Sequence, residues 1–365
     1  MAFGGKSQYA PLKGFDISGI SKKNIVLIII DGLGYEYLIK HEKRSFLRKN
    51  LRGKMTSVFP ASTASAMTSF TTGVAPQQHA LTGWFMYLKE IGVVFITLPF
   101  VSRAGNLKLW KGGIKYQDIY NEKSFFENLK ATSISIKHED IIDSEYSCLV
   151  TRGTKKLSFS TLNGFFRQIN KALRANNDRK FIFAYWAKFD SICHRKGTNS
   201  KETAKHFNEL DKKISSLAKH LKNKNAAIII TADHGVIDTK DKKKVIELKN
   251  HPKFAETLAM PISGEARVAY CYVRPRKIKQ FENYVKTKFK NCCEMHKSEE
   301  LIKNNYFGLF EPNKKLYERI GDYVLIMKDN YIMKDLVLGE KQNIFIGNHG
   351  GMSKEEMFVP LIIVE

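Results

Sequence analysis

The residues of this chain best suited to chemistry are aspartates that follow apolar segments and histidines close to them or in a glycine-rich turn. They are Asp31, Asp190, His194, Asp233, His234 and His349. Taken alone, each has an ordinary explanation, and Asp31 could simply cap the helix that follows it. Three carboxylates and three imidazoles brought to one edge of a sheet would repel strongly if the space between them were empty. The six residues together are therefore stronger evidence for a functional site than any one of them alone.

Two divalent cations would resolve this repulsion, because four positive charges would face three carboxylate charges and leave a slightly positive site. Such a site would attract phosphate and could hold both the attacking and the leaving oxygen of a displacement at phosphorus. Mixed ligation by histidine and aspartate suits Zn²⁺ best, with Mn²⁺ as the alternative. The pattern favours a two-metal hydrolytic site.

A nucleophile for such a site could come from residues 58–83, which are crowded with small and hydroxyl side chains. Pro60 predicts a turn, and residues 64–72 predict a helix closed by Gly73. A hydroxyl at the start of this helix would face the positive end of the helix dipole. The alternative is structural, since helices rich in serine, threonine and alanine often pack closely against a sheet.

The elements that must position these residues are continuous apolar strands. Residues 24–30, 180–187 and 225–231 read as strands buried on both faces, and amphipathic helices are predicted at 162–175 and 201–221. Alternating strands and helices predict an α/β fold, a three-layer sandwich with a largely parallel central sheet flanked by helices. Ligands of such sheets bind beyond the carboxyl ends of the strands, where the aspartates lie.

The domain organisation follows from a change in composition near residue 240, beyond which the chain becomes more charged. We predict a catalytic α/β core from residues 20–240 and 341–365, and a smaller appended lobe from 241–340. Within the lobe we expect strands at 266–273 and 322–327 and a helix at 278–289. For residues 103–160 the sequence does not predict a clear succession of helices and strands.

The composition indicates a folded protein with anionic partners. The net charge is +24, from 60 Lys and Arg against 36 Asp and Glu. This excess favours nucleotides or other phosphorylated ligands, although dispersed lysines on solvated helices explain it equally well. No nucleic-acid motif accompanies the charge, which argues against a nucleic-acid partner.

The five cysteines have no framework spacing, the start of the chain lacks a signal-peptide core, and the longest apolar run is too short to span a membrane. We expect a cytoplasmic protein without a membrane span, while export without a standard signal stays open. The oligomeric state is not predictable.

Five motifs then give a family resemblance. They are IIIDGLG, FPASTASA with TTGVAPQQHALTG, YWAKFDSICHRKG, TADHG and NHGGMSKEEMFVPLIIV, and together they span residues 25–364. Their order resembles that of the alkaline phosphatase superfamily, and most closely its type I phosphodiesterase/nucleotide pyrophosphatase branch. Because several motifs recur in the same order, this resemblance is far more specific than Asp-His-Gly alone.

The resemblance implies a role for each residue of the set. Thr63 matches the nucleophile, which is also bound to metal. The ligands match two sets: Asp31, Asp233 and His234 with the Thr63 oxygen at one ion, and Asp190, His194 and His349 at the other. The implied function is hydrolysis of phosphoric diesters or pyrophosphate bonds through a covalent phospho-threonine intermediate, with a small phosphorylated substrate.

Two substrate-binding positions depart from the family pattern. Ala64 follows the nucleophile where an aromatic residue is expected, and Trp84 stands where an asparagine is expected. Nucleotide specificity is therefore less well supported than the metal core. Two alternatives stay open: a metal-dependent phosphomonoesterase or phosphotransferase of the same superfamily, and a catalytically silent, basic nucleic-acid-binding protein.

Overall fold

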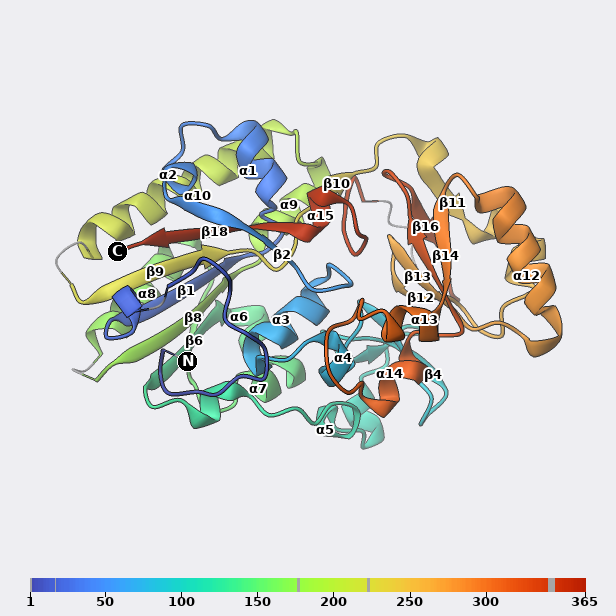
Figure 1. Cartoon of the computed structure of the whole chain (residues 1–365), viewed down its shortest axis with the longest axis horizontal. Coiled ribbons are helices and arrows are strands. Elements are labelled where there is room, and N and C mark those ends of the chain that lie inside the picture. Colours follow the sequence, from blue (N-terminus) through green and yellow to red (C-terminus); the bar gives the residue numbers. More distant parts are fainter. Residues whose placement is uncertain (1, 17, 176–177, 222–223, 341–344) are drawn as a thin grey trace.

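The computed structural model describes residues 2–16, 18–175, 178–221, 224–340 and 345–365, and it contains two large sheets (Figure 1). The first has seven strands in the order β2-β18-β9-β1-β8-β6-β7. These strands are β1 (Asn24–Ile30), β2 (Leu51–Thr56), β6 (Thr132–His138), β7 (Lys155–Phe159), β8 (Lys180–Trp186), β9 (Ala226–Thr231) and β18 (Phe358–Val364).

Pairing within this sheet is parallel except where β18 takes part. β1 pairs in parallel with β8 and β9, and β6 pairs in parallel with β7 and β8. β18 runs antiparallel to β9 and β2. The strands predicted at 24–30, 180–187 and 225–231 are β1, β8 and β9, and the prediction of a largely parallel sheet is confirmed. Burial on both faces explains their apolar runs, and every position of β8 is buried.

Helices cover both faces of this sheet, which confirms the three-layer sandwich. On one face lie α1 (Tyr35–His41), α8 (Leu162–Arg174), α9 (Lys188–Lys196) and α10 (Lys201–Leu221). On the other face lies α3 (Thr63–Thr72), whose Met67 packs with Ile29 and Phe183 of the sheet. Figure 1 shows α1 and α10 above the sheet and α3 below it.

The second sheet builds a smaller lobe beside the first, at the right of Figure 1. Its order is β14-β15-β13-β12-β3-β4-β5. The strands are β3 (Phe85–Leu88), β4 (Val93–Ile96), β5 (Val101–Ser102), β12 (Ser263–Glu265), β13 (Val268–Cys271), β14 (Cys293–Lys297) and β15 (Tyr323–Met327). This sheet therefore joins strands from the predicted lobe, 241–340, to strands from residues 85–102, which we assigned to the core. Residues 341–344, where the second core segment was predicted to begin, lie outside the described residues.

The remaining elements are short. The helices are α2 (Phe46–Lys49), α4 (Pro76–His79), α5 (Tyr116–Ile119), α6 (Glu139–Ile142), α7 (Glu145–Val150), α11 (Pro252–Ala255), α12 (Ile278–Tyr284), α13 (Ser298–Lys303), α14 (Lys314–Arg319) and α15 (Lys354–Met357). Two further strand pairs are β10 (Ile237–Asp238) with β17 (Gly347–Asn348), and β11 (Val245–Glu247) with β16 (Ile332–Lys334). A helix long and apolar enough to cross a membrane is not found in the described part of the chain.

A buried ion pair fixes the lobe to the segment that precedes β18. Arg267 donates from Nη2 to Glu356 Oε2 at 2.7 Å and from Nε to Glu356 Oε1 at 3.1 Å, and both side chains are fully buried. Glu356 also accepts from the backbone N–H of Gly351 at 2.7 Å, two residues beyond His349. The pair thus holds the turn that carries His349 against the second sheet.

Glu356→Gln is expected to lower the free energy of unfolding by about 3 to 5 kcal/mol, because it leaves the Arg267 guanidinium buried without a counter-charge. Chemical denaturation measures this loss. Glu355→Gln changes the neighbouring carboxylate, which is not fully buried, and is expected to shift stability by no more than about 0.5 kcal/mol. Equal effects of the two substitutions would contradict the role given to the pair.

Candidate active site

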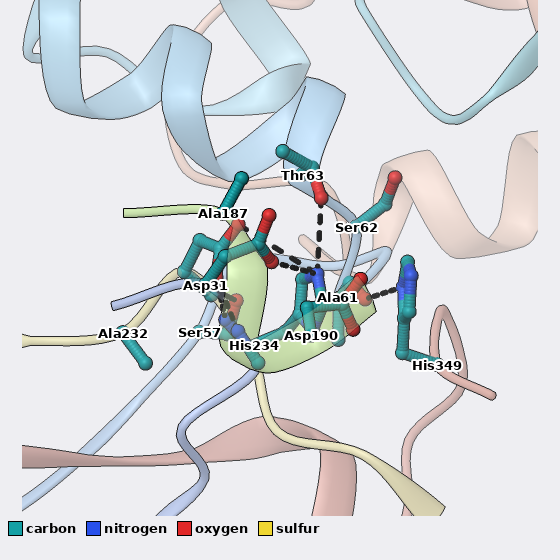
Figure 2. Close-up of polar contacts among 12 residues, drawn as sticks. Asp31, Ser57, Ala61, Ser62, Thr63, Ala187, Asp190, Ala232, His234 and His349 are labelled. Carbon is teal, nitrogen blue, oxygen red and sulfur yellow. Dashed lines mark hydrogen bonds and ion pairs between the residues drawn. The ribbon is translucent and has the colours of Figure 1, made fainter. Parts of the chain in front are cut away.

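The six predicted aspartates and histidines come together beyond the carboxyl ends of β1, β8 and β9. Figure 2 labels Asp31, Asp190, His234 and His349 among them. Asp31 directly follows β1, and Asp233 and His234 follow β9. Asp190 lies in the first turn of α9, immediately after β8. His349 comes from the turn after β17. The parallel sheet therefore gathers side chains that lie far apart in the sequence.

His194 joins this group through the geometry of α9. It lies one helical turn after Asp190, so the two side chains project from the same face. His194 Nε2 is 3.0 Å from Asp190 Oδ2. The His194 ring lies 5.1 Å from the ring of His349, centroid to centroid.

The three carboxylates share an unusual property. Each has a buried oxygen without a hydrogen-bond partner among the described residues: Asp31 Oδ1, Asp190 Oδ1 and Asp233 Oδ2. In Asp31 and Asp233 the second carboxylate oxygen accepts a hydrogen bond. Tyr185 donates its hydroxyl to Asp31 Oδ2, and Asp233 Oδ1 accepts from the backbone N–H of Gly32 at 3.1 Å. Because buried polar atoms are rarely left unpaired, these oxygens are the ones that metal ions would complete.

The three histidines are oriented in a common way. In each ring Nδ1 faces a backbone carbonyl oxygen, a contact that orients histidines which ligate metal through Nε2. The distances are 2.7 Å for His194 to Gly347, 3.0 Å for His234 to Gly235 and 3.1 Å for His349 to Ala61. Bound to metal, such rings would coordinate through Nε2; in this structure Nε2 of His194 lies 3.0 Å from Asp190 Oδ2, and Nε2 of His234 lies 3.1 Å from Thr63 Oγ1.

The pKa shifts within the group reflect both burial and the charges of neighbouring members. Burial, together with the charges of Asp233 and Asp190, raises the pKa of Asp31 well above its usual range. Burial also opposes ionisation of Asp190, but the adjacent His194 outweighs it and lowers the Asp190 pKa. Burial and the neighbouring His234 hold the pKa of His349 well below its usual range. A neutral His349 is ready to act as a ligand.

The donor atoms fall into two groups, each with atoms within 4.8 Å of one another. One group is Asp31, Asp233 and His234, which is the predicted first ligand set without Thr63. The other is Asp190, His234 and His349, which shares Asp190 and His349 with the predicted second set. His194 lies next to this second group through its contact with Asp190. The residues present fit two divalent cations on both charge and donor type.

Thr63 presents its hydroxyl to this group from the first position of α3. Its Oγ1 lies 3.1 Å from His234 Nε2, and Figure 2 shows the hydroxyl directed toward that ring. The neighbouring hydroxyls are engaged elsewhere: Ser57 donates to the carbonyl of Asp233 and Ser62 donates to Glu265. Of these three hydroxyls, that of Thr63 is the one directed at the two donor groups.

The two predicted substrate-binding positions differ in their placement. A cavity of about 1320 Å³ opens over the site, and its wall includes Thr63, Trp84 and Phe85. Ala64 is fully buried, and its carbonyl accepts a hydrogen bond from Thr68 Oγ1 at 2.7 Å. Trp84 can therefore meet a ligand directly, whereas a substrate contact of Ala64 stays a prediction.

Two residues that support the site were not predicted from the sequence. Tyr185 orients Asp31, and its only sequence signal is its place near the end of β8. Glu265, at the end of β12, accepts from the Ser62 hydroxyl and, at 2.7 Å, from the backbone N–H of Trp84. Glu265 thereby ties the lobe to the turn that precedes Thr63. Nothing in its local sequence could have indicated this contact.

Comparisons with known proteins place this site in context. A model of the type I phosphodiesterase/nucleotide pyrophosphatase family matches residues 25–352. A comparison with curated protein sequences found no match. Among solved structures, murine ectonucleotide pyrophosphatase/phosphodiesterase 5 is similar with a TM-score of 0.70 and 18% identity, over 93% of this chain and 87% of that chain. Phosphonoacetate hydrolase from Sinorhizobium meliloti 1021, solved with phosphonoformate, is similar with a TM-score of 0.66 and 17% identity, over 94% and 90% of the two chains. At these identities the solved structures support the fold alone.

Proposed function

The chain belongs to the type I phosphodiesterase/nucleotide pyrophosphatase family of hydrolases, and on this premise we propose that it cleaves phosphoric diesters or pyrophosphate bonds through a covalent intermediate on Thr63. One observation carries the proposal: the Thr63 hydroxyl lies 3.1 Å from Nε2 of His234, a residue common to both groups of candidate metal-binding donors. A nucleophile at the junction of two metal sites is the arrangement that an in-line displacement at phosphorus needs.

The residues that would hold the metals follow from the site. Asp31, Asp233, His234 and Thr63 would bind one ion, and Asp190, His194 and His349 the other. When bound, the ions would lower the pKa of a hydroxyl or water and neutralise charge on the phosphate oxygens. Zn²⁺ fits this donor set best, with Mn²⁺ as the alternative.

The chain supplies the remaining chemistry. The Thr63 hydroxyl loses its proton as its oxygen attacks phosphorus and forms a new O–P bond, while the leaving group departs with the electrons of the bond that breaks and takes up a proton. The first N–H groups of α3, which have no partner inside the helix, would donate to the phosphate oxygens. A water molecule then displaces Thr63 from phosphorus and restores the hydroxyl. Tyr185 keeps Asp31 oriented throughout.

Bis(p-nitrophenyl) phosphate is expected to be cleaved with a kcat/KM at least about 10-fold above that for p-nitrophenyl phosphate, a difference of about 1.4 kcal/mol. The diester carries one charge fewer, and its second aryl group can pack against Trp84 and Phe85 in the cavity. Release of p-nitrophenol measures both rates. An equal or reversed preference would contradict the diesterase proposal and favour a phosphomonoesterase of the same superfamily.

A further inference from the structure

A buried lysine in the cavity wall has no part in the chemistry described above. Lys137 lies near the carboxyl end of β6, is 3% exposed and lines the same cavity as Thr63. Its ammonium nitrogen is 3.1 Å from Ser147 Oγ and 5.9 Å from the centre of the Tyr146 ring. Burial lowers the pKa of Lys137 to about 7. Burial therefore makes the charged form of this amine costly unless an anion lies beside it.

The sheet places this lysine one strand away from the metal ligands. β6 pairs with β8 so that Ile136 lies opposite Ala184, and the next residues along the two strands are Lys137 and Tyr185. Tyr185 binds Asp31, while Tyr146, beside Lys137, lies 2.9 Å from Thr68 Oγ1 of α3. Lys137 thus lies on the α3 side of the sheet, close to the nucleophile helix. Within the described part of the chain it forms no contact with the metal-ligand set.

The other cations of the cavity wall have acidic neighbours. Arg103 pairs with Glu340, Lys249 pairs with Glu247, and Lys334 feels the charge of Glu265. Lys137 has no ion pair with a carboxylate among the described residues, and its ammonium group, which can donate three hydrogen bonds, is shown donating one. A buried charge without a counter-charge is costly, and a bound anion would offset that cost.

We propose that Lys137 and Ser147 form a subsite for a second anionic group of the substrate, a carboxylate or a phosphate on the part that Thr63 does not attack. This inference rests on the proposed function and narrows its substrate class to compact phosphodiesters or pyrophosphates that carry another acidic group. Lys137 supplies the charge, and the Ser147 hydroxyl can donate its own proton to the same oxyanion. No bond forms or breaks at this subsite, so it acts on specificity.

Three matched diesters test the subsite: p-nitrophenyl phosphates whose second ester group is ethyl, carboxymethyl or 2-phosphoethyl. A hydrogen-bonded charge pair of this kind is expected to raise kcat/KM for the two acidic esters about 10- to 100-fold above the ethyl ester. In Lys137→Met this ratio is expected to fall to about 1, and Lys137→Arg is expected to keep part of it. The difference between the carboxymethyl and the phosphoethyl ester shows which acid the subsite prefers.

Lys156→Met is the matched control, because Lys156 lies near Lys137 but outside the cavity wall, where it contacts Asp143. It should keep the full ratio. Loss of the ratio in both variants, or its persistence in Lys137→Met, would overturn the proposal. Thermal unfolding verifies that each variant is folded.

A binding measurement separates this inference from the proposed function. Calorimetry with the Zn²⁺-loaded protein compares ethyl phosphate with phosphoglycolate, which differ by one carboxylate. Lys137→Met should weaken binding of phosphoglycolate about 10-fold or more and bring it close to that of ethyl phosphate. If the wild-type protein cleaves none of the three esters, the proposed function fails, and the binding comparison still decides the role of Lys137. Equal affinities of the wild-type protein for the two ligands would overturn the subsite.

Discussion

Thr63→Ala is expected to lower turnover of a phosphodiester at least about 1,000-fold while leaving the fold and the metal content intact. The substitution removes the oxygen that lies 3.1 Å from His234 Nε2 and with it the covalent route. Thr63 is the first residue of α3, where alanine is well tolerated, so the helix should persist. Steady-state kinetics with bis(p-nitrophenyl) phosphate, together with elemental analysis of the same sample, measures both parts of this expectation.

Two variants control this experiment. Ser62→Ala removes the adjacent hydroxyl, which donates to Glu265 rather than to the metal group, and is expected to reduce turnover by no more than about 10-fold. Thr63→Ser keeps an oxygen at the same position and should retain more activity than the alanine variant. Full turnover in Thr63→Ala would move the nucleophile elsewhere in residues 58–83.

The parts of the fold that the sequence predicted are those whose signal is local. β1, β8 and β9 are long apolar runs, and each fixes the place of an aspartate at its carboxyl end. β6 escaped prediction because its sequence, TSISIKH, alternates serine and apolar residues although Ser133 and Ser135 are buried. The joining of β3 to β12 in one sheet depends on a contact between Phe85 and Gly264, which no local pattern encodes.

The difference between local sequence signals and contacts between distant segments also applies to the site. The six residues predicted as ligands lie in motifs, and the structure brings them together at one edge of the sheet. Lys137, Tyr185 and Glu265 depend instead on register and packing. Lys137 enters the cavity only because β6 pairs with β8, and Glu265 reaches the nucleophile turn only because the lobe folds back onto the core. Residues placed by register and packing are for this reason harder to predict than residues that lie in sequence motifs.

Removal of divalent metal ions is expected to abolish hydrolysis of the diester and to lower the melting temperature. Without ions, Asp31 Oδ1, Asp190 Oδ1 and Asp233 Oδ2 stay buried and have no hydrogen-bond partner among the described residues. Burial and the neighbouring carboxylates raise the pKa of Asp31. An ion present at 100 times its dissociation constant stabilises the folded state by about 2.7 kcal/mol, and that contribution is lost on chelation. Activity assays and thermal unfolding before and after dialysis against a chelator measure the two effects.

Two controls show whether the effect of the chelator comes from loss of ions at this site: re-addition of ions, and substitution of one predicted metal-binding residue. Zn²⁺ or Mn²⁺ should restore both activity and melting temperature to the chelated wild-type protein. Asp233→Asn should bind less metal and recover little activity, because it removes a charge from the first donor group. Asp241→Asn, which changes an aspartate outside both donor groups, should recover like the wild type.

A protein that binds no ion after supplementation, and whose stability the chelator leaves unchanged, would contradict the two-metal site. That outcome would favour the alternative function, a catalytically silent protein that binds nucleic acid. The net charge of +24 of the chain would supply the attraction to the phosphate backbone.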